Sequence, residues 1–417
     1  MSTRPHAPET TARWSAAARE VHRWMADRDY AGWDPFDFLA SPWLRAATLG
    51  TRWGGVALTQ LGRRLPFQLR PLLGVPRLRN AKGVALVVES LLRLQRRAGD
   101  PALGEEARGL TGWLLGSQGA EGGWGYPFPW ANRSFRVPAG TPSSVVTAFV
   151  GHSLLDAAEA GLRAGAVEDG LDRAGTFLLQ GLGRSGSDDG PFCFSYTPAD
   201  RRFVHNASVL AAALLARIGR RWGRDEALDA ALRAARFTVM SQDERGLWPY
   251  GLGSRDRWVD SYHTGYILMS LRTVAEALPG GGLEASIRRG VRAWERTFLV
   301  PPAVAHRPGR PWPVDAHAVA HAILTLLRFD DLVPDARVRA ETLAAWALDE
   351  MSTGEGRFHY LRHRRWTNRL PYMRWVQAWM LRALSELAAR SSDGPAGDAT
   401  GSRTATTAAG REAPGEG

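Results

Sequence analysis

Acidic, basic and phenolic side chains cluster at intervals along this chain in groups that could do chemistry. Asp260, Tyr262 and His263 lie close together, and Asp315 and His317 form a second such group. Two carboxylates can hydrolyse a glycosidic bond as acid and base, and Asp260 and Asp315 are the pair predicted for that role. For proton abstraction next to a sugar carboxylate, the base would be His263 or Tyr262, because histidine exchanges protons near neutral pH.

A larger set of side chains is predicted to bind the substrate. The arginine fork suits carboxylates, so Arg374 is expected to hold an acidic group. Aromatic rings can stack on the apolar faces of sugars or on prenyl chains. Lys82 is included because it is the only lysine of the chain. The predicted substrate-binding residues are Asp34, Lys82, Trp124, Tyr126, His205, Asn206, Trp248, Tyr250, His317, Tyr372 and Arg374.

Some of these residues have a structural interpretation as well. Asn206, Ser261 and Asp315 could cap helices, with Asp260 assisting, and capping does not exclude a role in function. His317 and His321 are four residues apart on one helix face, but two ligands without a third predict no metal site.

The single cysteine, Cys193, excludes a disulfide framework and any cysteine-based metal centre. No metal and no cofactor is therefore predicted.

Twelve helical segments must position these side chains. Six are apolar nearly all round and start near residues 80, 142, 206, 261, 316 and 372, so each is expected to be buried. The segments between them are amphipathic and rich in arginine, as expected of helices with one face in solvent. The predicted helices are 9–28, 80–98, 101–118, 142–163, 166–182, 206–221, 225–242, 261–278, 282–298, 316–329, 334–351 and 372–389.

This alternation of inner and outer helices predicts an all-α fold. Five outer helices follow inner ones, and the helix near 9–28 supplies the sixth, which closes a ring. We predict a single (α/α)6 toroid of six hairpins, with short loops on one face and long functional loops on the other. The toroid should span residues 9–390, with an insertion at Tyr30–Arg79. Residues 1–8 and 391–417 are polar and are expected to be disordered.

The formal net charge of +11 favours acidic partners: nucleic acid, an anionic membrane surface or an acidic glycan. Basic and aromatic residues do not interleave along one predicted helix face, so nucleic-acid binding is not expected. No apolar stretch is long enough to span a membrane, although peripheral membrane contact stays open. The N-terminal residues lack a basic patch followed by an apolar run, so a cytoplasmic protein is expected.

The long loops carry a repeated motif. Gln118-x-x-x-Gly122-x-Trp124 recurs as Gln242-x-x-x-Gly246-x-Trp248. This spacing resembles the QW repeat of the terpenoid cyclase and protein prenyltransferase superfamily, whose members are α/α toroids. The D-x-D-D acid of the class II cyclases and the zinc site of the prenyltransferases have no counterpart here.

Three segments together resemble the VpsJ-type proteins of bacterial exopolysaccharide-biosynthesis loci. They are Tyr30–Asp37 (YAGWDPFD), Trp258–Tyr266 (WVDSYHTGY) and Asn368–Trp375 (NRLPYMRW). The resemblance spans roughly residues 20 to 390 and implies an (α/α)-toroid with a place in glycan assembly, without implying a reaction.

Three functions follow as hypotheses. The first is a carbohydrate-active enzyme of polysaccharide biosynthesis, a hydrolase, lyase or epimerase that acts on an acidic or lipid-linked glycan at the toroid mouth. The second is a terpenoid cyclase-like or prenyl-binding enzyme, which requires a deep apolar cavity. The third is a non-catalytic glycan-binding scaffold.

Overall fold

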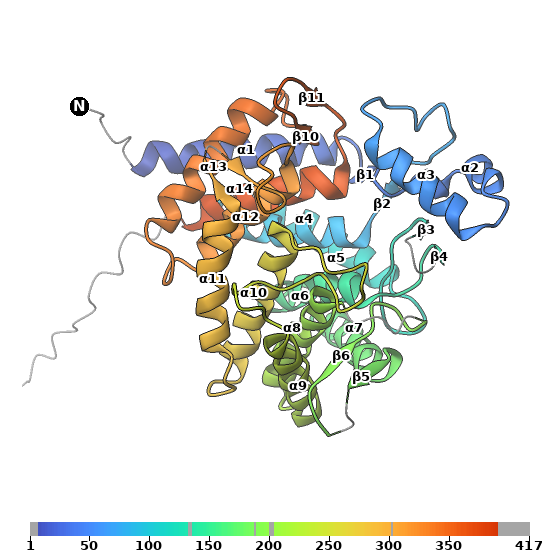
Figure 1. The fold of residues 1–417 in the computed structure, drawn as a ribbon. Helices are drawn as coiled ribbons and strands as arrows, with labels where there is room; N and C mark the ends of the chain where they lie inside the picture. Colours follow the sequence, from blue (N-terminus) through green and yellow to red (C-terminus); the bar gives the residue numbers. More distant parts are fainter. Residues whose placement is uncertain (1–6, 132–135, 187–188, 200–203, 302, 391–417) are drawn as a thin grey trace, which may run out of the picture.

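In a computed structural model that describes residues 7–131, 136–186, 189–199, 204–301 and 303–390, twelve helices alternate between an inner and an outer ring (Figure 1). The inner helices are α4 (Ala81–Ala98), α6 (Ser144–Glu159), α8 (His205–Trp222), α10 (Ser261–Ala277), α12 (Ala316–Arg328) and α14 (Ala378–Arg390). The outer helices are α1 (Ala7–Ala26), α5 (Pro101–Gly116), α7 (Ala164–Thr176), α9 (Asp225–Met240), α11 (Glu284–Phe298) and α13 (Ala336–Met351).

Contacts between successive inner helices close the ring. Each inner helix packs on the next one along the chain, and α14 packs against both α4 and α1, so the two ends of the described chain meet. The predicted (α/α)6 toroid is confirmed. Two helices differ from ideal geometry: a π-helical turn, η2 (Phe177–Gly181), extends α7, and another, η3 (Met373–Gln377), precedes α14. The predicted disorder of 1–8 and 391–417 falls outside the described residues, except that Ala7 and Pro8 begin α1.

Burial follows the sequence pattern of each helix type. In α8 nearly every residue from His205 to Gly219 is buried, as expected of a helix that is enclosed by its neighbours. In α9 only one stripe is buried, at Ala227, Ala230, Ala231, Ala234, Ala235 and Thr238. This spacing of three and four residues gives the outer helix one packed face and one solvent face.

The two faces of the ring differ in their loops. On one face the hairpin turns are tight: Gly99 and Gly223 end α4 and α8 in the left-handed conformation that glycine adopts without strain. The opposite face carries the long loops, which are stiffened by short antiparallel strands. These are β3 (Trp130–Ala131), β4 (Arg136–Val137), β5 (Arg184–Gly186), β6 (Phe192–Phe194), β7 (Leu299–Val300), β8 (Ala303–Val304), β9 (Val314–Asp315), β10 (Leu361–Arg362) and β11 (Thr367–Asn368).

Residues 30–79 leave the ring between α1 and α4 and stand at one edge of it (Figure 1). β1 (Ala31–Gly32) pairs with β2 (Leu78–Arg79) and brings the ends of this insertion together. It contains η1 (Phe38–Ala40), α2 (Pro42–Ala47) and α3 (Arg52–Arg64). A small apolar cluster of Leu39, Val56 and Ala131 packs α3 onto the β3 loop.

The two QW motifs form the same structure. Gln118 Nε2 donates to the carbonyls of Gly122 (2.7 Å) and Gly170 (2.9 Å) and so ties its loop to the next outer helix. The Trp124 indole is 1% exposed and donates to the Leu114 carbonyl at 2.8 Å. The second motif repeats these bonds: Gln242 Nε2 donates to two carbonyls, and Trp248 donates to Thr238 at 2.8 Å.

The structural role of the QW motif can be tested at Gly122. Its φ is 87°, and a Cβ at this position would lie 2.4 Å from the Arg173 carbonyl oxygen. We expect Gly122→Ala to lower the free energy of unfolding by about 2 kcal/mol, from backbone strain and a clash that the helix cannot relieve. Chemical denaturation measures it. As a control, Gly109→Ala on the exposed face of α5 meets no atom within 4 Å and should stabilise by about 0.5–1 kcal/mol.

Candidate active site

A cavity of about 770 Å³ opens on the long-loop face, where the N-terminal ends of the inner helices converge. Eight of the predicted site residues line it: Lys82, Tyr126, Asn206, Tyr250, Tyr262, His263, His317 and Arg374. These residues come from six different parts of the chain, and the ring closure alone brings them together. The cavity is therefore the candidate active site.

Asp260 and His263 form a hydrogen-bonded pair at the start of α10. Asp260 caps the helix by accepting from the His263 amide (2.9 Å), and its other oxygen lies 2.7 Å from His263 Nδ1. Burial raises the pKa of Asp260, but the neighbouring His263 outweighs it and holds that pKa below its ordinary value. The carboxylate therefore stays charged and can accept a proton from Nδ1 of His263, and in that tautomer the lone pair of the ring is on Nε2.

A second proton-carrying pair lies on the neighbouring helices. The Tyr266 hydroxyl and His317 Nε2 share a hydrogen bond of 2.6 Å. The Tyr262 ring stacks on both His306 and His317, with centroid distances of 5.1 and 4.7 Å. Burial holds the pKa of His317 well below its ordinary value, so the imidazole is neutral. Tyr262 and Tyr266 are thus both in contact with His317.

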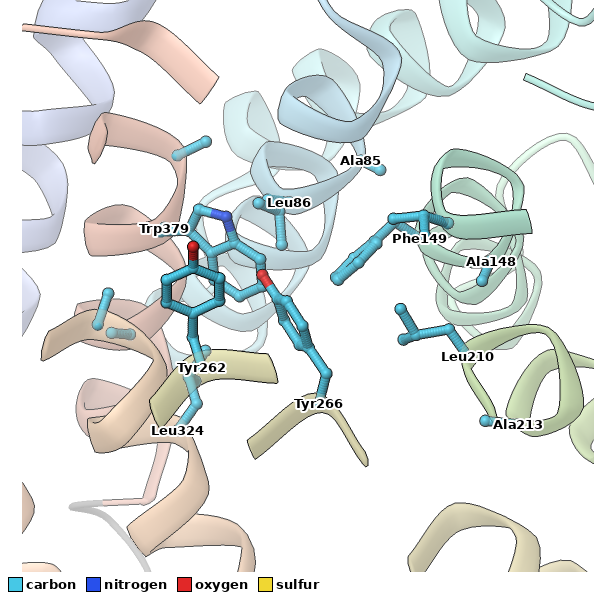
Figure 2. Close-up of a cluster of buried hydrophobic side chains, with 14 of the residues drawn as sticks. Ala85, Leu86, Ala148, Phe149, Leu210, Ala213, Tyr262, Tyr266, Leu324 and Trp379 are labelled. Carbon is cyan, nitrogen blue, oxygen red and sulfur yellow. The ribbon is translucent and has the colours of Figure 1, made fainter. Parts of the chain in front are cut away.

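Three aromatic rings, of which Tyr266 lines this cavity, form a floor shared with a second cavity. Phe149, Tyr266 and Trp379 come from α6, α10 and α14, and their centroids are 5.5 to 5.7 Å apart (Figure 2). Lys82 Nζ lies above them, 3.9 Å from the centre of the Phe149 ring. Burial and the charge of Arg374 hold the pKa of Lys82 well below its ordinary value. Below this floor the ring has a second cavity, of about 730 Å³, at its other opening.

Arg374 is fixed by a buried ion pair. Its Nε and Nη2 donate to the two carboxylate oxygens of Asp34 at 2.6 and 2.8 Å, and both side chains are at most 5% exposed. The pair joins the insertion to the last inner helix. Asp34 thus acts on the cavity through Arg374 rather than by lining it.

The insertion supplies part of the cavity wall. Phe36, Trp53, Val56, Thr59, Gln60, Arg63 and Arg64 all face the opening. The lining holds Arg63, Arg64, Arg255, Arg307 and Arg374, whereas Asp256 is the only carboxylate among the lining residues that the structure describes. An anionic ligand suits such a balance.

Several predicted site residues lie outside the cavity. Trp124 and Trp248 are buried in the QW contacts and hold hairpins together, so the structure gives them no surface for stacking on a sugar. His205 and Tyr372 are fully buried next to the cavity wall. Asp260 and Asp315 cap α10 and α12 behind the wall, so the predicted carboxylate pair does not face the opening. Asn206 lies inside α8 and is not its cap.

Other lining residues were not among the predicted site residues. Tyr196, His306 and Trp375 come from the loops and from η3, and Arg63 comes from the insertion. Trp258 and Tyr266 are the first and last residues of one of the three segments that resemble VpsJ-type proteins, so that resemblance could have predicted both. Nothing in the sequence around Arg63 marks it.

His317 and His321, which are four residues apart on one helix face, have no third side chain beside them, among those described, that would complete a metal site. His321 Nδ1 lies 3.2 Å from the Thr325 hydroxyl, and His317 Nε2 shares a hydrogen bond with the Tyr266 hydroxyl. Within the described ranges, no three His, Cys, Asp or Glu side chains come close enough to hold a metal ion.

The buried position of Asp315 predicts a pH effect on stability. Burial raises its pKa from 3.8 to about 7, although the His317 amide and the Trp375 indole donate to it. Because the folded-state pKa is above the unfolded one, the protein should lose stability as the pH rises from about 4 to 7.

Asp315→Asn keeps both acceptor bonds but cannot ionise. Above pH 7 the variant should therefore be more stable than the wild type by on the order of 1 kcal/mol or more, with no such gain at pH 4. Melting temperatures over this pH range check it, and parallel curves for the two proteins would rule out a raised pKa.

Comparison with known proteins supports the fold. No protein-family model and no curated protein matches the chain significantly. Among solved structures, the chain is similar to cellobiose 2-epimerase from Spirochaeta thermophila (TM-score 0.57, 12% identity, covering 75% of this chain and 86% of the other). It is also similar to the GH76 α-mannanase from Bacteroides thetaiotaomicron (TM-score 0.56, 12% identity, 74% and 86%).

A third similar structure is an unsaturated glucuronyl hydrolase specific for heparin (TM-score 0.54, 14% identity, covering 84% of this chain and 95% of the other). These neighbours are (α/α)6 toroid enzymes that act on carbohydrates. At such identities the likeness establishes the architecture. None of the described helices has both the length and the hydrophobicity needed to cross a bilayer.

Proposed function

We propose that this protein is a carbohydrate-active enzyme of bacterial polysaccharide biosynthesis that binds an acidic or lipid-linked glycan in the long-loop cavity. The reaction we favour is proton abstraction next to a uronate carboxylate. One observation carries the proposal: the Asp260–His263 pair, the Tyr266–His317 pair and an excess of arginine all meet in one aromatic-lined cavity.

The lining supports a sugar acid rather than an isoprenoid. Tyr126, Tyr250 and Trp258 offer flat faces on which a sugar ring can stack. Tyr250 and Trp258 are themselves stacked at 4.3 Å. The arginines and histidines between these rings would be desolvated without compensation by a purely apolar substrate. An anionic glycan gives them partners, and Arg64, Arg255 and Arg307 of the lining are the candidates to hold its carboxylate, because Arg374 is already paired with Asp34.

Proton transfer fits the site better than hydrolysis by paired carboxylates. Glycoside hydrolysis needs two carboxyl groups that flank the bond, whereas Asp260 and Asp315 are at most 3% exposed and do not line the cavity. His263 Nε2 can remove the proton from the carbon next to the carboxylate. In epimerisation a proton returns to the opposite face of that carbon. In elimination the C–O bond to the leaving sugar breaks as the C=C bond forms, and the leaving oxygen takes a proton.

The glycan class is supported by two further observations. The structural neighbours are a mannanase, an epimerase and a glucuronyl hydrolase. Three segments of the chain also resemble proteins of bacterial exopolysaccharide loci.

The test is incubation of the purified protein in D2O with uronate-containing and matched neutral oligosaccharides, free and lipid-linked, followed by mass spectrometry. Epimerisation should incorporate one deuterium, and elimination should give an unsaturated uronate. Addition of water across a glycosidic bond would favour hydrolysis and contradict the proposed reaction. Binding without any change in mass would favour the scaffold hypothesis.

A further inference from the structure

The insertion exposes an unusual amount of apolar surface. Of the large hydrophobic side chains that are exposed in the described part of the chain, half lie between residues 43 and 72. Trp43, Leu49 and Leu72 are 79%, 86% and 84% exposed, and Phe67 is 67% exposed. An apolar patch of this kind on an otherwise charged protein marks a surface that binds something.

Helix α3 differs from an ordinary surface helix in which side chains it buries and which it exposes. Its buried residues are small or polar, namely Gly55, Val56, Thr59 and Gly62. Its exposed face carries Trp53, Ala57 and Leu61 at four-residue spacing. A helix that hides its small residues and shows its large apolar ones is suited to insertion into an apolar medium.

The same segment carries only positive charge. No aspartate or glutamate occurs between Asp37 and Glu89. Arg52, Arg64 and Arg77 are exposed and Arg45 is partly exposed, so cations surround the apolar side chains. Tryptophan and arginine together, without acidic residues, match the chemistry of the interface of an anionic bilayer.

The patch stands on a rigid base. Arg70 is fully buried and donates to Asp37 (2.7 Å) and to the carbonyls of Asp34 and Gly62 (2.9 and 3.3 Å). The Trp33 indole donates to the Val75 carbonyl at 2.9 Å. These bonds tie together the backbone segments of the insertion that carry the exposed apolar side chains.

We propose that the surface formed by α2, α3 and residues 65–77 docks on an anionic lipid membrane. Trp43, Leu49 and Leu72 enter the interface, and Arg45, Arg52 and Arg77 contact lipid headgroups. Because Trp53, Gln60 and Arg64 of α3 also line the cavity, docking places the cavity mouth at the membrane surface. The docking does not depend on the proposed reaction. The idea that docking gives the cavity access to a lipid-linked glycan does rest on the proposed function.

A membrane explains the surface better than a protein partner. Exposed arginines and exposed apolar side chains occur together in the insertion, and the insertion stands at the edge of the ring (Figure 1). A protein partner would need a matching acidic rim. If the same surface of a second copy of this chain bound here, arginine would face arginine, because the segment has no acidic residue that could pair with it.

Vesicle co-sedimentation tests the proposal, with phosphatidylcholine vesicles that contain or lack phosphatidylserine. The wild type should bind the anionic vesicles and release them at high salt. Arg45→Gln/Arg52→Gln/Arg77→Gln should weaken this binding by about 100-fold, since each arginine near an anionic surface contributes about five-fold. Trp43→Ser/Leu49→Ser/Leu72→Ser should weaken binding by at least as much.

Controls keep the outcomes distinct. Met240→Ser/Leu252→Ser/Val338→Ser removes exposed apolar side chains elsewhere and should leave vesicle binding unchanged. Both insertion variants should keep the wild-type melting temperature and turnover of soluble oligosaccharides, so that docking and reaction are judged separately. Equal binding to both kinds of vesicle, no binding to either, or a dimer that Trp43→Ser/Leu49→Ser/Leu72→Ser converts to a monomer would each overturn the proposal.

Discussion

His263→Ala is expected to lower turnover of an acidic oligosaccharide by about 10²–10⁴-fold, the usual contribution of a general base. The ring faces the cavity, and Asp260 fixes its Nδ1 at 2.7 Å, so that Nε2 carries the lone pair. Alanine removes the base but keeps the backbone amide that Asp260 caps. Initial rates from the mass-spectrometric assay, at saturating and limiting substrate, separate the loss in kcat from any change in KM.

Two further variants identify the role of His263. Asp260→Asn keeps an acceptor for the helix cap but loses the charge that orients the ring, so kcat should fall by less than in His263→Ala. His363→Ala, in a loop where His363 stacks on Trp366 outside the cavity, should have wild-type rates. Undiminished turnover in His263→Ala would remove this residue from the mechanism.

Asp34→Ala is expected to destabilise the protein by about 3–5 kcal/mol, because it leaves the Arg374 guanidinium buried without its counter-charge. Both Arg374 bonds to Asp34 lie in the interior, where water cannot replace them. Chemical denaturation measures the loss. Arg374→Met should be similarly destabilised, and Asp34→Asn/Arg374→Met should recover part of it, because no charge then remains unpaired.

A surface ion pair provides the matched control. Arg245 donates to Asp243 at 2.8 Å, but the Arg245 side chain is 70% exposed. Removing it should cost less than about 1 kcal/mol. If Asp34→Ala were no more costly than Arg245→Ala, the insertion would not depend on its buried anchor.

Periodicity predicted the architecture because each inner helix is enclosed on all sides and each outer helix on one. The wholly apolar run at 209–216 and the alanine stripe of 227–235 reflect those environments. The helix near 9–28 could be placed as the closing element because five outer partners left one position empty. Convergence of the inner helix starts then predicted which regions meet.

Which side chain of each region faces the cavity was harder to predict. His205 and Asn206 are adjacent, yet only Asn206 lines the opening, and a small rotation of α8 decides between them. Trp124 and Trp248 had the residue type of a sugar platform, but the QW turn points them between hairpins. The insertion has no repeat partner in the chain, so nothing in the pattern could align Arg63 with the inner helices.

Phe149, Tyr266 and Trp379 pack together, and Tyr266 lines both the long-loop cavity and the cavity at the other opening of the ring (Figure 2). These packed rings lie in the path of a polymer through the ring, so a ligand in the long-loop cavity would enter and leave by the same mouth. If the proposed function holds, an oligosaccharide would bind by one end or lie across the mouth, and it would not thread through the ring.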